Sequence, residues 1–270
     1  MDEKITTSIL KKYRKEIWGP FTSALKEYRL IFEGDKIAVC MSGGKDSAIL
    51  AVLMRQIQLH SDVPFELEYI AMDPGYSPAN RARLEENCRL LDIPVHIFET
   101  NIFSVAEKQE KNPCYLCARM RRGYLYTYAK SLGCNKIALG HHFSDVIETT
   151  LMGMLWGAQI QGMLPKLHST SHPGMELIRP LYHIREDSII AWAKYNSLEF
   201  LRCACKLTES AEIDENLSKR RETKALIKML RENGNPDIEK NIFNSIHHAN
   251  VETLIGYKLN GEEHSFLDNY

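Results

Sequence analysis

The sequence predicts an α/β fold built around a parallel sheet. Four short apolar runs, rich in β-branched residues, have the length of strands, and the segments between them carry apolar residues at helical spacing. Strands that alternate with helices of about 12 or more residues form βαβ units, and such units make parallel sheets. The 270 residues suit one domain of this kind with an appendage, or two small domains.

The expected elements alternate along the chain. Strands are expected at residues 36–42, 66–73, 94–100 and 136–142, with helices between them at 47–60, 78–91 and about 103–132. Outside this part we expect helices over 5–33 (broken at Gly19-Pro20), 144–157 and 185–198, a hairpin-like stretch over 158–181 that closes the sheet, a helical tail over about 206–248, and short extended pieces at the end. These boundaries predict an N-terminal helical region at 1–34, a central α/β domain at 35–205 and a C-terminal helical region at 206–270.

Polar residues stand at the carboxyl ends of the expected strands. Ser42, Asp73, Thr100 and the pair His141-His142 end or follow the four apolar runs. Parallel strands end at the same edge of a sheet, and open α/β sheets bind ligands there. We therefore expect these side chains to share one site.

The segment SGGKDS, from Ser42 to Ser47, has the composition of a phosphate-binding loop. Gly43 and Gly44 allow a tight turn that aims backbone N–H groups at an anion, and Lys45 adds a positive charge. The loop is shorter than the G-x-x-x-x-G-K-[ST] loop of the mononucleotide type, so it suits a pyrophosphate at the start of the following helix. The simpler alternative is an ordinary strand-to-helix turn.

Seven cysteines in a chain without an apparent secretion signal indicate metal, redox or catalytic chemistry before disulfides. Cys114 and Cys117 form a C-x-x-C pair, which can hold a metal ion or an iron–sulfur cluster, or form a disulfide. Cys203 and Cys205 are the downstream candidates for a further ligand. The alternative for Cys114 and Cys117 is a pair of core cysteines one helical turn apart. The remaining cysteines are expected in the core: Cys40, Cys88 and Cys134.

The segment after the fourth expected strand, ALGHHFSDVIET, is a second candidate for nucleotide contact. Gly140 would permit a close approach of the backbone, and His141 or His142 could face a phosphate. Asp145 suits Mg²⁺, which prefers carboxylate and phosphate oxygens, but it could also cap the helix. Asp46 in the loop is a further candidate for Mg²⁺.

The SGGKDS segment resembles the PP-loop signature of the ATP pyrophosphatases, a branch of the adenine nucleotide α-hydrolase-like fold. This resemblance implies a Rossmann-like parallel sheet and a PP-loop ATPase domain at 35–205 that carries the C-x-x-C helix as an insertion. It also implies Mg²⁺-dependent cleavage of ATP between its α- and β-phosphates. The expected nucleotide-binding residues are those of the loop, with Ala71, Met72, Asp73, Gly140 and His141.

Five motifs in order are similar to the tRNA 2-thiocytidine synthetase (TtcA) family: SGGKDS, PCYLCARMRRGYLYTYAKSLG, KIALGHHFSDVIETTLMGMLWG, MLPKL and IRPL. The similarity runs over about residues 20–250. It implies a [4Fe-4S] cluster held by Cys114, Cys117 and one downstream cysteine, with the free iron carrying the sulfur that is transferred. The third ligand is Cys203 or Cys205, and the resemblance does not choose between them.

The same resemblance implies an ATP-dependent tRNA sulfurtransferase that adenylates a cytidine, with position 32 as the expected target, and replaces its 2-oxygen with sulfur. The expected partners are tRNA, a sulfur donor such as a cysteine desulfurase or sulfide, and a second copy of the chain in a homodimer. The expected catalytic residues are Lys45, Asp46, Cys114 and Cys117, and the expected tRNA contacts are Arg119, Arg121, Arg122 and Arg179. Basic clusters at 11–15 and 219–224 could also contact tRNA, although charge runs on helices are often only solvated faces.

The bulk composition sets weak limits on function. A formal net charge of -1 lacks the global basic signature of a nucleic-acid binder, although a local basic patch would suffice. No apolar run approaches the roughly 20 residues that span a bilayer, and the N-terminus lacks the apolar core of a signal peptide, so we expect a cytoplasmic protein. The alternatives are another PP-loop tRNA modifier (a 2-thiouridine synthase or a lysidine-type ligase) and a non-catalytic nucleotide- or redox-sensing protein.

Overall fold

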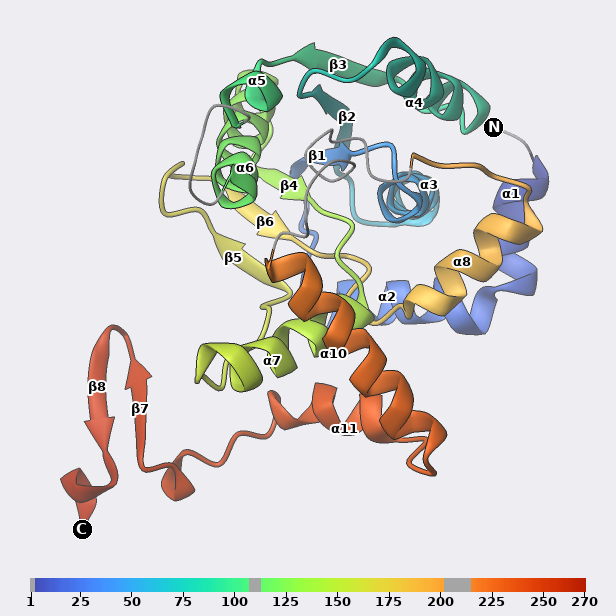
Figure 1. Ribbon diagram of the computed structural model, residues 1–270. Coiled ribbons are helices and arrows are strands. Elements are labelled where there is room, and N and C mark those ends of the chain that lie inside the picture. The colour runs from blue at the N-terminus through green and yellow to red at the C-terminus, as the bar shows by residue number, and fades with distance from the viewer. Residues whose placement is uncertain (1–2, 107–112, 202–214) are drawn as a thin grey trace. The chain divides into compact units, whose positions relative to one another are not determined.

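The computed structural model describes residues 3–106, 113–201 and 215–270 (Figure 1). The chain divides into two compact units, the first comprising residues 1–146 and 164–218 and the second comprising 147–163 and 219–270. Each unit is described separately. The division into three regions at residues 34 and 205 stays a prediction.

The first unit contains a six-stranded sheet with strand order β3-β2-β1-β4-β6-β5. All neighbouring strands are parallel except β5 and β6, which are antiparallel. The predicted parallel sheet and the hairpin that closes it are therefore confirmed. The strands are β1 (Lys36–Met41), β2 (Glu66–Asp73), β3 (Val95–Glu99), β4 (Lys136–Ala138), β5 (Lys166–His168) and β6 (Glu176–Ile178).

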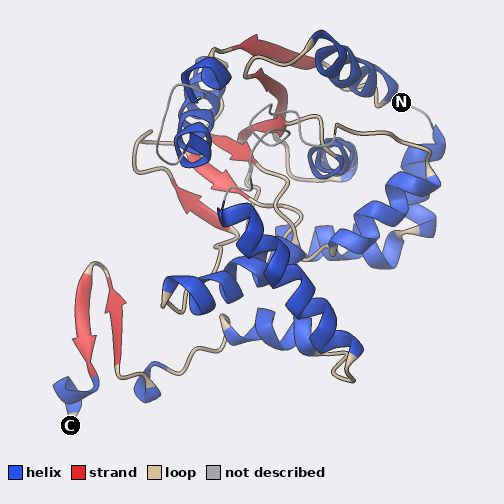
Figure 2. Ribbon diagram, in the orientation of Figure 1, coloured by secondary structure: helices blue, strands red, loops and turns tan. Residues whose placement is uncertain are grey.

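Helices connect the parallel strands and form the N-terminal part of the chain (Figure 2). They are α1 (Glu3–Thr7), the π-helices η1 (Ser8–Lys12) and η2 (Arg14–Trp18), α2 (Gly19–Glu27), α3 (Lys45–His60), α4 (Pro78–Leu90), α5 (Ile102–Ala106), α6 (Pro113–Ser131), α7 (Phe143–Gly157) and α8 (Glu186–Tyr195). The helix predicted over about 103–132 corresponds to α5 and α6 in the described residues, and residues 107–112 between them lie outside the described part of the chain. Proline lacks an N–H group and is favoured at the first position of a helix, so Pro113 marks a start rather than an interior residue.

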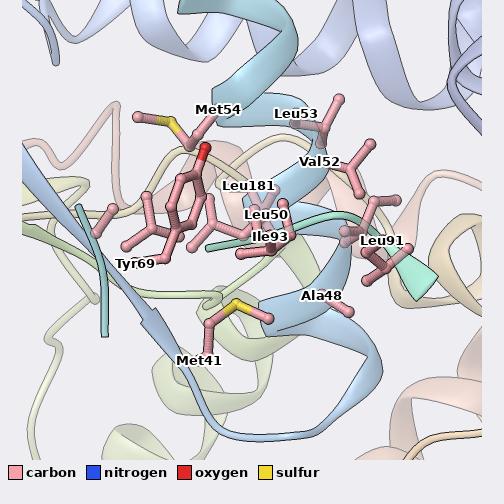
Figure 3. Packing of buried hydrophobic residues seen from close by; sticks show 14 of the residues in the cluster. Met41, Ala48, Leu50, Val52, Leu53, Met54, Tyr69, Leu91, Ile93 and Leu181 are labelled. Atoms are coloured by element: carbon pink, nitrogen blue, oxygen red, sulfur yellow. The ribbon is translucent and has the colours of Figure 1, made fainter. Parts of the chain in front are cut away.

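Two apolar clusters cover the two faces of the sheet, and β1 contributes to both. Ile37, Val39 and Met41 belong to the cluster that includes α3, α8 and the N-terminal helices. Ala38 and Cys40 belong to the cluster that includes α6. Figure 3 shows side chains of the first cluster along α3, among them Leu50, Leu53 and Met54. Burial on both faces explains why β1 reads as an almost continuous apolar run.

The second unit contains α7 from residue 147 onward, α10 (Glu215–Glu232) from residue 219 onward, α11 (Ile238–Ser245), η3 (Val251–Thr253) and η4 (Phe266–Asn269). Its two-stranded sheet pairs β7 (Gly256–Leu259) with β8 (Glu262–Ser265) in antiparallel fashion. From residue 215 onward these elements confirm the predicted helical tail and the extended pieces that follow it, and residues 206–214 of the predicted tail lie outside the described residues. No helix in the described part of the chain is long and apolar enough to cross a membrane.

Candidate functional site

The loop between β1 and α3 is held in a tight turn by its own hydrogen bonds. The Ser47 hydroxyl donates to the Gly44 carbonyl over 3.0 Å and accepts the Ser42 N–H over 3.1 Å. Gly43 has a φ of +80°, a conformation that residues with a side chain rarely adopt. Helix α3 begins at Lys45, so its free N–H groups face the loop, as an anion-binding site requires.

The side-chain ammonium group of Lys45, in the loop, is held by two carboxylates. The Nζ atom of Lys45 lies 2.9 Å from a Glu186 carboxylate oxygen and 3.1 Å from an Asp46 oxygen. Burial alone would lower the pKa of Lys45, but the negative charges of Asp46 and Glu186 outweigh it and hold that pKa above its usual value. Lys45 is therefore a positioned cation that can meet a phosphate.

A buried histidine lies between two acids beside the loop. The side chain of His142 is 4% exposed, with Nε2 3.7 Å from Asp46 and Nδ1 3.2 Å from Asp145. The Asp145 carboxylate also accepts the backbone N–H of His142 over 3.0 Å. The structure thus brings Lys45, Asp46, His142 and Asp145 together beside the loop. His141, which follows Gly140 in the same segment, is partly buried.

The backbone at Gly140 approaches the start of α3 closely. A Cβ atom built on Gly140 would lie 3.0 Å from the Asp46 carbonyl carbon and 3.1 Å from the Ser47 nitrogen. This close contact explains why β4 ends at Ala138, before the predicted end at residue 142, because the chain leaves the sheet to pass over the loop. Glycine is required here for its lack of a side chain.

Substituting Gly140→Ala is expected to push the start of α3 out of place. We expect the free energy of unfolding to fall by about 1–3 kcal/mol, the usual range for overpacking, and ATP binding to weaken. Urea unfolding and titration calorimetry with ATP would measure both effects. The matched control is Gly123→Ala in α6, where a Cβ meets nothing within 4 Å and should leave ATP binding unchanged. Equal ATP affinity in the two variants would contradict this account of Gly140.

Asp73, at the end of β2, organises the turn that follows it. Its Oδ1 accepts the N–H groups of Gly75 and Tyr76 over 2.9 and 2.7 Å, and its Oδ2 lies 2.9 Å from Arg81. The Tyr76 hydroxyl donates to the Ser42 carbonyl over 3.4 Å and so links this turn to the loop. The neighbouring predicted residues are buried in β2, with Ala71 0% and Met72 6% exposed.

The protonation of Asp73 predicts a pH-dependent part of the stability. Burial would raise the pKa of Asp73, but the Tyr76 N–H, the Arg81 guanidinium and the Gly75 N–H outweigh it and hold that pKa below its usual value. A carboxyl group whose pKa is lower in the folded state stabilises the fold. This stabilisation is fully present at pH values above the pKa of the unfolded state, about 3.9, and is lost as the pH falls through the pKa of the folded state. Substituting Arg81→Gln should therefore cost about 1–2 kcal/mol near pH 6, and this difference from wild type should shrink below about pH 4.

Urea unfolding of wild type and Arg81→Gln between pH 7 and pH 3 would measure that difference. The control is Arg83→Gln on the same helix, because Arg83 makes an exposed ion pair with Glu199 at 3.4 Å and no other ion pair with a described residue. An Arg81→Gln deficit that stays constant down to pH 3 would show that Asp73 does not carry the effect.

The arginines predicted to contact tRNA differ in their surroundings. Arg119 and Arg122 on α6 are exposed, and the Arg121 guanidinium lies 5.5 Å from the centre of the Phe103 ring. Arg179 donates from its guanidinium to the Leu164 carbonyl, and burial lowers its pKa to about 10.

The cysteines separate into core residues and candidate ligands. Cys40, Cys88 and Cys134 are buried, as predicted, and burial raises the pKa of Cys88 and of Cys134 to about 11, so both stay protonated. Cys117 on α6 is only partly buried. The predicted ligands Cys203 and Cys205 lie outside the described residues, as does the side chain of Cys114, although α6 begins at Pro113 and includes its backbone.

One residue of the site was missed by the sequence analysis, and for a second the sequence left a choice open. Glu186, which holds Lys45, is the first residue of α8 and lies 141 positions away in the sequence. Its only sequence signal is an acid at the start of a helix, which is also common for purely electrostatic reasons. His141 and His142 were both expected at the strand-end site, and the sequence left open which of them faces a phosphate.

Comparison with known proteins gives a consistent result. Residues 11–208 match the PP-loop domain family. The chain is 32% identical to a tRNA-cytidine(32) 2-sulfurtransferase of Geobacter metallireducens over 90% of this chain and 91% of that protein. It is also 32% identical to a protein of the same name from Citrifermentans bemidjiense, over 86% and 89% of the two chains. With the equivalent protein of Delftia acidovorans it shares 35% identity over 71% of this chain, but it spans only 62% of that longer protein.

Among solved structures, the U34-tRNA thiolase NcsA from Methanococcus maripaludis with its [4Fe-4S] cluster has the same fold. The TM-score is 0.64 at 21% identity, over 88% of this chain and 80% of that chain. At this level of identity the likeness concerns the fold.

Proposed function

We propose that this chain, which belongs to the tRNA-cytidine(32) 2-sulfurtransferase family of PP-loop proteins, uses ATP to activate a cytidine of tRNA and replaces its 2-oxygen with sulfur. The matches to the PP-loop domain and to these relatives confirm the family resemblance of the five sequence motifs. One observation above all supports the activation step: a short glycine loop at the start of α3, with Lys45 held by two carboxylates. The target position, 32 of the anticodon loop, follows the names of the relatives.

In the proposed activation, the loop N–H groups and Lys45 bind the phosphates of ATP, with Ala71, Met72, Asp73, Gly140 and His141 around the nucleotide as predicted. The cytidine O2 attacks the α-phosphate, the bond between the α- and β-phosphates breaks, and pyrophosphate leaves. Fixed positive charge at the departing phosphates is what such a site contributes.

The same site suits Mg²⁺, which would neutralise the charge of the leaving pyrophosphate. Asp46 Oδ1 is buried and makes no hydrogen bond to any described residue, so a hard cation would satisfy it. Asp145, on the other side of His142, is the second proposed ligand. The Asp145 carboxylate accepts the His142 N–H, which fixes its orientation.

The sulfur is proposed to come by way of a [4Fe-4S] cluster. Cys114 and Cys117 are three residues apart on α6, a spacing that places both on one face of a helix, and one of Cys203 and Cys205 would complete a set of three thiolates. These three thiolates would hold the cluster, which would supply the sulfur for the transfer. The sulfur forms a bond to C2 of the activated base, the C2–O bond breaks, and AMP leaves with the oxygen.

Arg119, Arg121, Arg122 and Arg179 are proposed to contact tRNA phosphates while the target base is splayed out of its loop. Sulfide or a cysteine desulfurase is the proposed donor. We further propose a homodimer, and the cytoplasm as the compartment where this tRNA modification takes place.

The products of ATP cleavage test the proposed activation. Incubation of the iron-loaded protein with tRNA, sulfide and α-labelled ATP is expected to give AMP and pyrophosphate in equal amounts, and only when tRNA is present. Release of ADP and phosphate would contradict it, and AMP release without tRNA would favour a nucleotide-binding protein without transfer activity. A preparation free of iron that still modified tRNA would point to a lysidine-type ligase instead.

A further inference from the structure

Helix α10 carries a row of positive charges that the ATP chemistry does not use. Arg220 and Arg221 are adjacent, and Lys224, Lys228 and Arg231 follow at spacings of three or four residues; we call these five the cationic stripe. Residues at these spacings are neighbours on a helix surface, so the stripe occupies one side of α10. Arg221, Lys224 and Lys228 are exposed, and Arg220 and Arg231 are partly exposed.

The side of α10 next to the stripe is buried. Thr223 is 0% and Ile227 5% exposed, and the Thr223 hydroxyl donates to the Lys219 carbonyl over 2.7 Å. With this side buried, Arg221, Lys224 and Lys228 remain exposed beside it.

A buried acid of the same unit lies against the stripe. The Glu148 side chain on α7 is 3% exposed, and its carboxylate oxygens lie 3.7 Å from Arg220 and 3.6 Å from Lys224. Like charges at helical spacing destabilise a helix, and one carboxylate beneath two of the cations offsets part of that repulsion. Arg221 makes no ion pair with any residue that the structure describes, and Lys228 has only a 3.8 Å contact with Glu232.

We propose that the cationic stripe of α10 binds backbone phosphates of tRNA. The proposal rests on the proposed function, because it takes tRNA as the partner. Its support is independent of the ATP site: the matched PP-loop domain ends at residue 208, whereas α10 begins at Glu215. A row of exposed cations on a fixed helix meets a phosphate backbone through charge, without reading its sequence. The stripe thus positions the RNA, while the base to be modified is selected elsewhere.

The test measures tRNA binding by fluorescence anisotropy at several salt concentrations. The variant Arg221→Gln with Lys228→Gln removes two exposed charges that lie away from Glu148, so folding is not at risk. The control, Lys26→Gln with Lys194→Gln, removes two equally exposed charges from α2 and α8. We expect the α10 variant to raise the Kd for tRNA about ten-fold at moderate salt and to reduce the slope of log K against log[salt] by about 2.

Two results would overturn the proposal: an unchanged Kd in the α10 variant, or an equal loss of affinity in the control, which would show a general charge effect. Nucleoside analysis of the same samples separates this proposal from the function. If wild type modifies tRNA but the α10 variant binds tRNA normally, the function stands and the stripe fails. If the wild type leaves tRNA unmodified but the α10 variant binds tRNA more weakly than the wild type, the function fails and the stripe stands.

Discussion

Substituting Lys45→Gln should lower kcat/KM for ATP about 100- to 1000-fold, the usual cost of losing one positioned charge at a reacting phosphate or oxyanion. The substitution leaves the Asp46 and Glu186 carboxylates facing the phosphate site without the cation that offsets them. Repulsion between these acids and the triphosphate then adds to the lost attraction. Initial rates of tRNA-dependent pyrophosphate release would measure the effect.

Lys36 offers a closely matched control for this substitution. It lies at the other end of β1, its side chain is 28% exposed against 26% for Lys45, and it pairs with Glu68 at 2.9 Å. Lys36→Gln therefore removes the same charge and a similar ion pair at a site far along the strand. We expect it to change kcat/KM less than three-fold. A comparable loss of activity in the two variants would mean that Lys45 acts through stability rather than through the phosphates.

Substituting Cys117→Ala is the second change with a large expected effect. If Cys117 is a cluster ligand, its loss leaves two thiolates, and we expect both the bound iron and the thiolation of tRNA to fall below a tenth of wild type. Iron content and the visible absorption of anaerobically reconstituted protein measure the cluster directly. Binding of ATP should be retained, because the substitution does not change the loop between β1 and α3.

Cys134→Ala is the control for general effects of removing a thiol. Cys134 is 4% exposed in the core beside α6, and burial raises its pKa to about 11, so it is not available as a thiolate. This variant should lose some stability but keep its iron and its activity. Full iron content in Cys117→Ala would exclude Cys117 as a cluster ligand. The cluster proposal would then have no ligand among the residues that the structure describes.

The parts of the fold that depend on local pattern were predictable from the sequence. The run from Lys36 to Met41 is buried on both faces of the sheet, and continuous apolar composition is the signal of that environment. The tight turn of the loop was also predictable from local sequence, because position 43 has a positive φ, which favours glycine. The strand ends could be brought together in the prediction because parallel strands share one carboxyl edge.

The parts that depend on long-range contacts were not predictable. No local sequence pattern predicts the contact between Glu186 and Lys45, because the two residues lie on different helices and are 141 positions apart in the sequence. The choice between His141 and His142 depends on where the chain leaves β4, and the close approach of Gly140 to Asp46 sets that point.

The most direct test of the central claim is nucleoside analysis of tRNA after anaerobic incubation with the iron-loaded protein, ATP, Mg²⁺ and sulfide. We predict 2-thiocytidine at position 32. We predict none when ATP is replaced by an analogue whose bond between the α- and β-phosphates cannot be cleaved. Unmodified tRNA after ATP consumption, or sulfur found on a uridine instead, would contradict the account.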